Sequence, residues 1–504
     1  MKTIPLLTRL LSVAVAATLS LQSIAAQLPD LGDTASSILS PALEKKIGDE
    51  ALASYRFEDP SYIDDPELES YFDTLGSRLS ASGATGDRNF TFFVLKDSTI
   101  NAFAMPGGVI GVHSGLVVNS QTESELAAVI SHEMAHIVQH HIGRGAAAQS
   151  NSTAWMLASL LVAILAARNS PTATEAALAT GMAAGTQSQL NFSRDFEREA
   201  DRIGFQILTA AGFDPQGMPS FFTRLQQITG TEDSAYAFLR THPLTADRIS
   251  DMQGRVRSQP YRQVPDSIEY ALTRAKLTVI QETPNATFQR LRHSEGGRIQ
   301  DKAARWYGLT LAHLAERNYT EAQRNFNQLA ALKLKTPMVA TLGAQIELEQ
   351  GHGADAAKIC HAARSSYPGW RTLSYCEAQG LLTAGDGEGA LALVTDLLNL
   401  TPGDFRLYAL EAKIYTALNK PALAHRAQSQ VYLMHGLLQP AIEQMRLAQR
   451  SPGANAYEEA AIDAHLRELR IRLCEETDGK IKSDPRASEP SKDGSTSDKC
   501  TKLP

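Results

Sequence analysis

The stretch SHEMAHIVQHH, residues 131–141, contains four histidines and one glutamate. Within it, His132, Glu133 and His136 fit the pattern H-E-x-x-H. On a helix, the two histidines lie one turn apart and point the same way, so both can bind one Zn²⁺ ion. Glu133 projects about 100° away around the helix axis, where it can take a proton from a zinc-activated water. The motif predicts a hydrolytic zinc site with Glu133 as catalytic base; the alternative is a helix whose histidines are merely solvated.

A second helix is expected to supply the third ligand, because the motif helix lacks the further glycine and histidine of the metzincin pattern. Residues 196–204 read FEREADRIG, in which Glu197 and Asp201 share one helix face. Glu197 is the predicted ligand. Asp201 is expected to accept the free N–H of a ligand histidine and so fix its tautomer. Glu199 points elsewhere and is the alternative ligand.

A further histidine, His242, lies in the segment THPLTADRI. Pro243 biases the preceding residue away from helix, so His242 is expected at a loop–helix junction. We favour His242 as a fourth zinc ligand at rest, which displaces the catalytic water and must move for catalysis. Two alternatives stay open: a hydrogen bond to the oxyanion during hydrolysis, or a purely structural role. His140, one turn beyond His136, is predicted to lie outside the ligand set, since three protein ligands plus water complete a catalytic zinc site.

Strands and helices must position these residues. The segment 90–96 is rich in β-formers, and 100–117 reads as two strands around Pro106-Gly107-Gly108, expected to present an unpaired edge to a bound peptide at 100–105 and 109–113. The motif helix should begin near Thr122, which has capping-box spacing to Glu125. Further helices are expected at 41–85, at 195–210 and, as a hairpin, at 216–255. The apolar run 154–167 is interpreted as a buried helix, with a flap that contacts a membrane as the alternative.

The segments HEMAH, EREAD and THPLTADRI occur in the order and form seen in the Ste24/HtpX-like zinc metallopeptidases. INAFAMPGG, just upstream, is similar to a β segment of that family. The resemblance implies a gluzincin-type fold that hydrolyses peptide bonds. It also implies one Zn²⁺ per chain, bound by His132, His136 and Glu197, with Glu133 as catalytic base.

The C-terminal part of the chain repeats. Ala322, Ala356, Ala390 and Ala424 are each 34 residues apart. This period is typical of the tetratricopeptide repeat, a helix–turn–helix unit that stacks into a solenoid with a concave docking surface. The predicted fold class is therefore mostly α: a gluzincin-type α+β metallopeptidase domain with a small β-sheet, followed by an α-solenoid of tetratricopeptide repeats. We expect the repeats to recruit substrates and the N-terminal part to do the chemistry.

The first residues have the layout of a secretory signal peptide: Lys2 and Arg9, an apolar run at 10–21, and small residues before a cleavage point after Ala25 or Ala26. Export to the periplasm is the expected outcome. The predicted organisation is a signal peptide at 1–26, a zinc metallopeptidase domain at 27–260, a polar connecting segment at 261–302, a repeat domain at 303–474 and a disordered tail at 475–504.

Four cysteines lie far from the histidine motif: Cys360, Cys376, Cys474 and Cys500. None forms a C-x-x-C pair, so a cysteine-based zinc site is unsupported. In an oxidising compartment the pairs Cys360–Cys376 and Cys474–Cys500 could be bridges, and the sequence leaves the connectivity open.

A chain of 504 residues with 43% hydrophobic and 20% charged residues is typical of a globular protein of two or three domains. Its net charge of −7 gives no basic surface for nucleic acid. The resemblance extends to periplasmic, repeat-bearing members of the family. It implies outer-membrane quality control: degradation of unfolded or misassembled β-barrel proteins, assistance to their assembly, and contact with the β-barrel assembly machinery. A peripheral membrane contact stays open, and the alternative function is a chaperone or scaffold with a largely idle protease domain.

Overall fold

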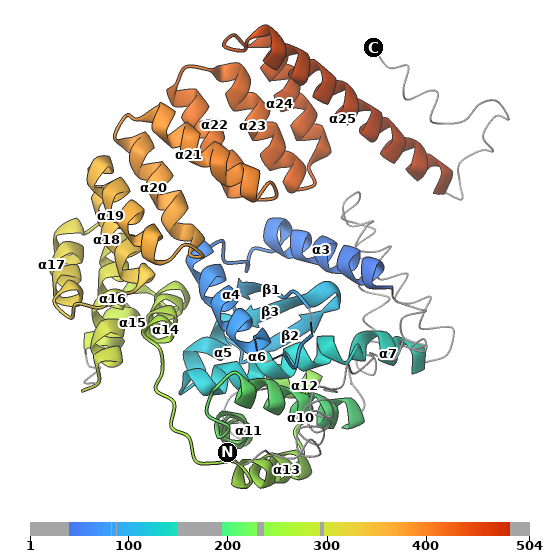
Figure 1. The fold of residues 1–504 in the computed structure, drawn as a ribbon, viewed down its shortest axis with the longest axis vertical. Helices are drawn as coiled ribbons and strands as arrows, with labels where there is room; N and C mark the ends of the chain where they lie inside the picture. The colour runs from blue at the N-terminus through green and yellow to red at the C-terminus, as the bar shows by residue number, and fades with distance from the viewer. Residues whose placement is uncertain are drawn as a thin grey trace, which may run out of the picture.

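The computed structural model describes residues 40–81, 83–86, 88–148, 194–228, 236–292 and 297–483. Its N-terminal half surrounds a small sheet, and its C-terminal half is an array of antiparallel helices that curves around the first half (Figure 1). The strands are β1 (Thr91–Leu95), β2 (Ala102–Met105) and β3 (Val109–His113), with the short 3-10 helix η1 (Pro106–Gly108) between the last two. The helices of the N-terminal half are α3 (Pro41–Glu58), α4 (Pro66–Ser80), α5 (Ser114–Asn119), α6 (Glu123–Val138), α7 (His141–Ala148), α10 (Arg194–Ala210), α11 (Gly217–Ile228), α12 (Tyr236–Thr241) and α13 (Ala246–Arg257).

The helices that follow run from the connecting segment to the end of the repeats. They are α14 (Ile268–Gln281), α15 (Pro284–Arg292), α16 (Ile299–Ala315), α17 (Tyr319–Ala330), α18 (Pro337–Glu349), α19 (Gly353–Ser366), α20 (Arg371–Thr383), α21 (Gly387–Leu400), α22 (Phe405–Ala417), α23 (Pro421–Met434), α24 (Leu438–Arg450) and α25 (Ala456–Ser483). The fold is thus mostly α with one small sheet, which confirms the predicted class.

The sheet has the strand order β1-β3-β2, with β3 parallel to β1 and antiparallel to β2. The turn between β2 and β3 contains Gly107 and Gly108, whose φ values of 75° and 85° are accessible to glycine without strain. Both strands expected within 100–117 are therefore present. Within the described part of the chain, β3 lies between the other two strands, so β1 and β2 are the edge strands, and β2 is the one that falls in the expected segment 100–105. The expectation that 109–113 also presents an edge is wrong, because strand order is decided by distant packing.

Helix α6 carries the histidine motif. The Thr122 hydroxyl accepts the N–H of Glu125 at 3.1 Å, and the Glu125 carboxylate accepts the N–H of Gln121 at 2.7 Å. The predicted capping box is present, with its return bond one residue earlier than in the standard form. Every residue from Glu123 to Ile137 is buried, so the motif side chains lie inside the protein.

Helix α10 packs closely against α6 and matches the helix predicted at 195–210. A Cβ atom placed on Gly204 would lie 3.1 Å from the backbone nitrogen and Cα of His132, so glycine permits the close approach. Glu197 and Asp201, one turn apart on α10, are both buried. The close packing brings these two carboxylates to the histidines of α6.

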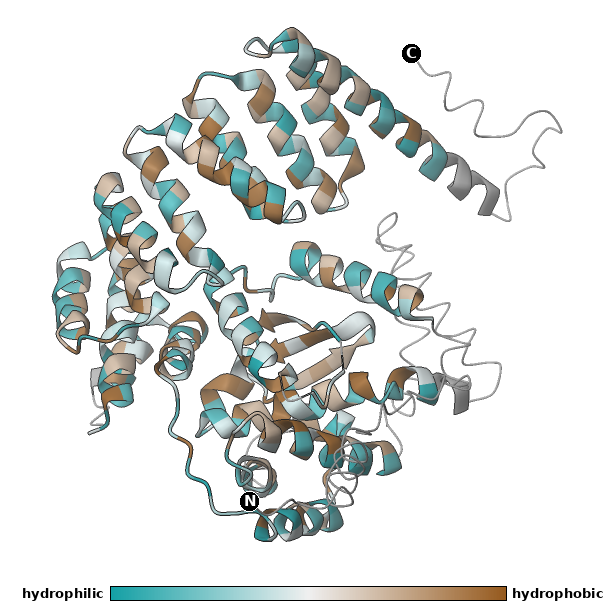
Figure 2. Cartoon of the chain, viewed as in Figure 1, coloured by the Kyte–Doolittle hydropathy of each residue, from teal (hydrophilic) through white to brown (hydrophobic). Residues whose placement is uncertain are grey.

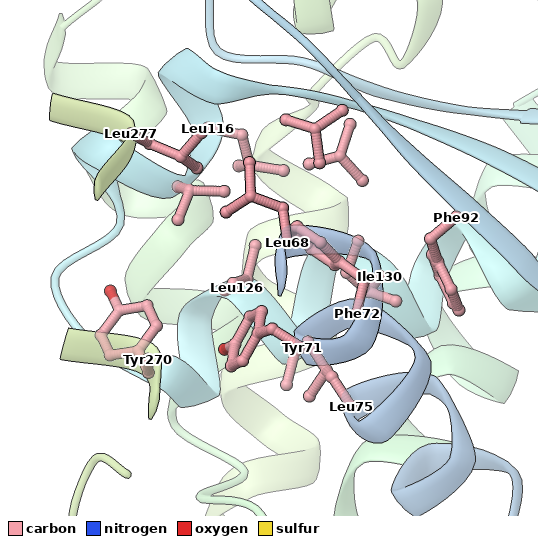
Figure 3. Packing of buried hydrophobic residues seen from close by; sticks show 14 of the residues in the cluster. Leu68, Tyr71, Phe72, Leu75, Phe92, Leu116, Leu126, Ile130, Tyr270 and Leu277 are labelled. Atoms are coloured by element: carbon pink, nitrogen blue, oxygen red, sulfur yellow. The ribbon is translucent and has the colours of Figure 1, made fainter. Parts of the chain in front are cut away.

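One hydrophobic core extends from the sheet and α6 into the first repeats. Figure 3 shows side chains of α4 packed against α6 and α14, among them Leu68, Tyr71, Phe72, Leu126, Ile130, Tyr270 and Leu277. Polar contacts cross the same boundary, since Lys276 Nζ and Tyr307 OH lie 2.9 Å and 2.8 Å from Glu67 Oε2. Residues 261–302 thus connect the two halves through α14 and α15, and α14 belongs to the shared core.

The C-terminal half is built from paired antiparallel helices, and its last helix, α25, runs past residue 474 to Ser483 (Figure 1). Ala322, Ala356 and Ala390 are fully buried at matching positions of α17, α19 and α21, where small side chains allow neighbouring helices to approach. Cys360 of α19 and Cys376 of α20 form a disulfide, which is one of the pairings that the sequence left open. Cys500 lies outside the described residues, and so does most of the expected tail.

The segment 216–255 contains three helices, α11, α12 and α13, where a hairpin was expected. The short helix α12 ends just before Pro243, which cannot continue it. Hydrophobic residues gather on the sheet and the helices that enclose it, while polar residues dominate the outer faces (Figure 2). Across the described ranges, no helix combines the length and apolar character that crossing a membrane requires. The signal peptide and the run 154–167 lie outside those ranges.

Candidate metal centre

Three elements bring four metal-binding side chains together. His132 and His136 come from α6, Glu197 from α10, and His242 from the loop between α12 and α13. One nitrogen or oxygen atom of each lies within 4.8 Å of the corresponding atoms of the other three. All four side chains are buried. The three residues predicted as ligands therefore meet, and His242 joins them from the end of α12, a helix–loop junction rather than the expected start of the next helix.

The separations between atoms of this group are close to those around a tetrahedral ion, although Glu197 enters one pair through Oε2 and another through Oε1. His132 Nε2 lies 3.1 Å from His136 Nε2, 3.5 Å from Glu197 Oε2 and 3.4 Å from His242 Nδ1. His242 Nδ1 lies 3.1 Å from Glu197 Oε1. Four atoms bonded at about 2.0–2.1 Å to one tetrahedral zinc ion lie about 3.3 Å from one another. The group therefore has the ligand types and about the size of a zinc site, and His242 lies beside the three expected ligands.

The charge of the site also favours a divalent cation. Glu133, Glu197 and Asp201 are buried carboxylates, and the guanidinium of Arg248 is buried beside them. Buried charges are costly unless opposite charge compensates them. Burial opposes protonation of His132, yet the carboxylates of Asp201 and Glu197 outweigh it and raise its pKa to about 10. The surroundings therefore stabilise added positive charge, which Zn²⁺ supplies.

Asp201 lies behind His132, on the side away from the ligand group. Its Oδ1 lies 3.1 Å from His132 Nδ1. Arg248 of α13 binds the same carboxylate through two hydrogen bonds, of 2.6 Å from Nε and 2.7 Å from Nη2, and its Nη1 lies 2.8 Å from Glu197 Oε2. Burial alone would raise the pKa of Asp201, but Arg248 and His132 hold it below its usual range. An ionised Asp201 can accept the Nδ1–H of His132, which leaves Nε2 available to a metal.

Glu133 lies beside the ligand group and against the edge strand. Its Oε1 lies 3.4 Å from His242 Nε2, and the backbone N–H of Ala104 in β2 acts to lower the pKa of the Glu133 carboxyl group. Burial raises the pKa of Glu133, and the charges of His242 and His132 offset part of the rise. A raised pKa suits a group that must take up a proton during catalysis.

His141, and not His140, contacts the ligand group. Helix α6 ends at Val138, and His140 has a φ of 53°, so the chain turns before α7 begins. This turn brings His141 Nδ1 to 2.8 Å from His136 Nδ1, and His141 Nε2 lies 3.3 Å from Glu199 Oε2. Burial lowers the pKa of His141 to about 4, although Glu199 opposes the shift. Glu199, the alternative ligand, therefore lies outside the ligand group, and so does His140.

Two residues of the site were not predicted. Arg248 stands in the segment THPLTADRI, six residues after His242. This short distance from a predicted site residue was the only sequence feature that pointed to Arg248. His141 stands in the same cluster as the motif, but an ideal helix continued through it points it away from His136. The left-handed residue before it, His140, changes that direction.

Residues 66–256 match the model of peptidase family M48. The matched range contains all four residues of the ligand group, together with Glu133, Asp201, Arg248 and His141. Over 446 residues the chain is 31% identical to the beta-barrel assembly-enhancing protease of Escherichia coli, covering 88% of this chain and 91% of that protein.

Two further relatives match shorter stretches of this chain. A Vibrio cholerae protein described in similar words is 41% identical over 251 residues, which cover 50% of this chain and 52% of that protein. Metalloprotease LoiP of Escherichia coli is 27% identical over 229 residues, which cover 43% of this chain and 82% of LoiP. This chain thus aligns with about half the length of the Vibrio protein and nearly the whole length of the first Escherichia coli relative.

Proposed function

This chain belongs to peptidase family M48 and is a zinc metalloendopeptidase, and from that premise we propose that His132, His136 and Glu197 bind the catalytic Zn²⁺. The observation that carries the assignment is the buried group in which these side chains converge with His242. When bound, zinc supplies Lewis-acid activation of a water molecule. Glu133 takes the proton of that water and passes it to the amine nitrogen of the leaving peptide. Asp201 and Arg248 hold His132 and Glu197 in place.

His242 holds the enzyme in a resting state in this proposal. Its Nδ1 faces the ligand group at 3.4 Å from His132 Nε2 and 3.1 Å from Glu197 Oε1. Its Nε2 lies 3.4 Å from Glu133 Oε1, so the imidazole occupies the space between the metal position and the base. Water and substrate need that space. Catalysis therefore requires the loop between α12 and α13 to move His242 away.

Substrate adds to strand β2 as a further antiparallel or parallel strand. The N–H of His113 donates to the carbonyl of Asn101 at 3.0 Å, which fixes the alternation of hydrogen bonds along the pair. In that alternation, the N–H groups of Ala102 and Ala104 point away from β3. The N–H of Ala104 acts on the pKa of the Glu133 carboxyl group, which supports placing this outward edge next to the base. Main-chain bonding of this kind gives weak sequence selectivity, which suits unfolded clients.

The proposed setting is the periplasm, after removal of a signal peptide at residues 1–26. The substrates are misfolded or misassembled outer-membrane β-barrel proteins, and the beta-barrel assembly-enhancing protease of Escherichia coli, similar over most of both chains, supports this choice. The repeats at 303–474 recruit these clients, bind the β-barrel assembly machinery and assist assembly. Described residues of the metallopeptidase part, among them Leu68 and Tyr71, share one core with α14 and the first repeats, which supports coupling of recruitment to cleavage.

Cleavage of an unfolded β-barrel protein by the purified mature chain tests this proposal. The wild type is compared with the Glu133→Gln variant, which keeps a similar shape but cannot act as a base. We expect cleavage by the wild type, none by the variant, and equal zinc content in both. Equal cleavage by the two proteins would remove Glu133 from the mechanism. Zinc-loaded wild type that binds the client without cutting it would favour the alternative, a chaperone or scaffold.

A further inference from the structure

The metal ligand His136 has an unusual partner on its outer side. The corresponding nitrogen of His132 faces the carboxylate of Asp201 directly, at 3.1 Å. His136 instead faces another imidazole, with 2.8 Å between its Nδ1 and Nδ1 of His141. The far nitrogen of His141, Nε2, lies 3.3 Å from Oε2 of Glu199. The two histidine ligands therefore differ in what supports them, and the chain Glu199–His141–His136 has no role in the reaction described so far.

The geometry allows one arrangement of protons in this chain when Nε2 of His136 binds the metal. A neutral imidazole that coordinates through Nε2 carries its proton on Nδ1. That Nδ1–H must donate to Nδ1 of His141, which therefore carries no proton. His141 then holds its own proton on Nε2 and donates it to the Glu199 carboxylate. A second proton on His141 would place two N–H groups against each other across 2.8 Å.

Local structure fixes His141 in this orientation. Its ring stacks on Phe196, with ring centroids 4.7 Å apart and an interplanar angle of 11°. Arg144 binds Glu199 Oε2 at 2.9 Å, and its Cζ lies over the Phe196 ring, 4.8 Å from the ring centroid. The left-handed turn at His140 sets the start of α7 and so places the imidazole of His141 next to that of His136. His141 is fully buried, so water does not compete with its two protein partners.

We propose that His141 is a positioning residue that fixes the tautomer and ring orientation of His136 and thereby sets the affinity for zinc, with Glu199 holding His141 in the required tautomer. This proposal rests on the assignment of His136 as a ligand. An outer hydrogen-bond acceptor orients a ligand histidine and increases its basicity, and loss of such a partner typically costs about 10–100-fold in metal affinity or activity. His141 does not touch substrate or metal, so its effect should appear in metal binding even when no substrate is present.

Two substitutions at this position separate positioning from packing. His141→Phe keeps an aromatic ring on Phe196 but removes the acceptor. His141→Asn loses the ring but keeps an acceptor oxygen close to the place of Nδ1. His140→Asn is the matched control, since the neighbouring side chain lies outside the chain of bonds and asparagine tolerates its positive φ. The zinc dissociation constant of each mature variant is measured by competition with a chromophoric chelator, and the Co²⁺-substituted forms are compared by their visible absorption spectra.

We expect His141→Phe to weaken zinc binding about 10–100-fold and to shift the cobalt spectrum, because His136 is no longer held. His141→Asn and His140→Asn should stay within about threefold of the wild type and keep its spectrum. Wild-type affinity in His141→Phe would overturn the proposal, and so would an affinity in His141→Asn as low as that of His141→Phe. Should the phenylalanine variant fail to fold, a loss of more than about tenfold in His141→Asn still counts against the proposal.

A separate variant distinguishes this proposal from the ligand assignment on which it rests. His136→Ala should reduce zinc binding far more than any substitution of His141, since it removes a ligand. If His136→Ala keeps tight, stoichiometric zinc, the ligand assignment itself is wrong. If His136→Ala loses zinc while His141→Phe binds it normally, only the positioning role is wrong.

Discussion

The Nδ1 atom of His242 lies 3.1 Å from Oε1 of Glu197, although the two residues are 45 positions apart in the chain. The imidazole thus faces the same point in space as the glutamate and the two histidines of α6. A catalytic zinc site keeps one position open for water, whereas a structural site fills all four. In the proposed function, a site with four protein ligands and a base beside it would correspond to an enzyme at rest.

His242→Ala is expected to raise basal cleavage of an unfolded protein, because removal of the imidazole opens the fourth position to water. If the open form is populated at about 1–10% in the wild type, the increase is about 10–100-fold. Initial rates at equal zinc content measure the effect. A lower rate with zinc retained would instead support a hydrogen bond from His242 to the oxyanion, and an unchanged rate would leave a structural role.

Arg248→Met is expected to destabilise the metal-free protein by about 3–5 kcal/mol, because the buried carboxylates of Asp201 and Glu197 lose their shared partner. Urea unfolding measures the change. Arg255→Met on the same helix is the control: its ion pair with Asp251 is exposed and should contribute less than about 1 kcal/mol. Similar losses in the two variants would show that Arg248 does not neutralise the site.

Backbone methylation of a peptide substrate tests the docking edge without changing the protein. A bound strand directs alternate N–H groups toward β2, so N-methylation at one set of alternate positions should abolish cleavage. Methylation at the other set should leave cleavage largely intact. The measurement is the rate for each methylated peptide relative to the parent. Equal rates for both sets would exclude pairing with β2.

The contact between the two halves should depend on pH through Glu69. Arg406 of α22 donates to both carboxylate oxygens of Glu69 at 2.9 Å. Burial acts to raise the pKa of Glu69, but the bonds from Arg406 outweigh it and lower the pKa below the usual 4.5. A carboxyl group with a lowered pKa stabilises the fold above its ordinary pKa, and that stability is lost as pH falls through the lowered value.

Glu69→Gln should therefore lower the melting temperature at neutral pH, and the difference from the wild type should shrink below pH 4.5. Glu388→Gln is the control, since its carboxylate is exposed and lies 3.6 Å from Lys420. It should change the melting temperature little at any pH. A constant difference for Glu69→Gln across the whole pH range would contradict the ion-pair account.

Local sequence predicted the parts of this protein that depend on short-range patterns. The Thr122–Glu125 spacing located the start of α6, and the four-residue spacing of Glu197 and Asp201 gave the correct face of α10. The 34-residue period of Ala322, Ala356 and Ala390 located the helical repeats. In each case the determinant lies within one helix or one repeat unit.

Features that depend on contacts between distant residues could not be predicted from local sequence. The segment 261–302 joins the core through buried side chains of α14 such as Leu272 and Leu277, and Lys276 of the same helix pairs with Glu67, more than 200 positions away. The central place of β3 follows from its pairing with both other strands, which its own residues do not specify. His141 contacts His136 because the single left-handed residue His140 interrupts an otherwise regular helix. These three outcomes needed the tertiary structure.

X-ray absorption at the zinc edge of the purified mature protein tests the central claim most directly, because it counts imidazole ligands at the metal. The account predicts four-coordinate zinc with three imidazole nitrogens and one carboxylate oxygen in the wild type. It predicts two imidazoles in His242→Ala, with a solvent oxygen in the vacated position. Two imidazoles in the wild type, or the same number in both proteins, would contradict the claim that His242 closes the site.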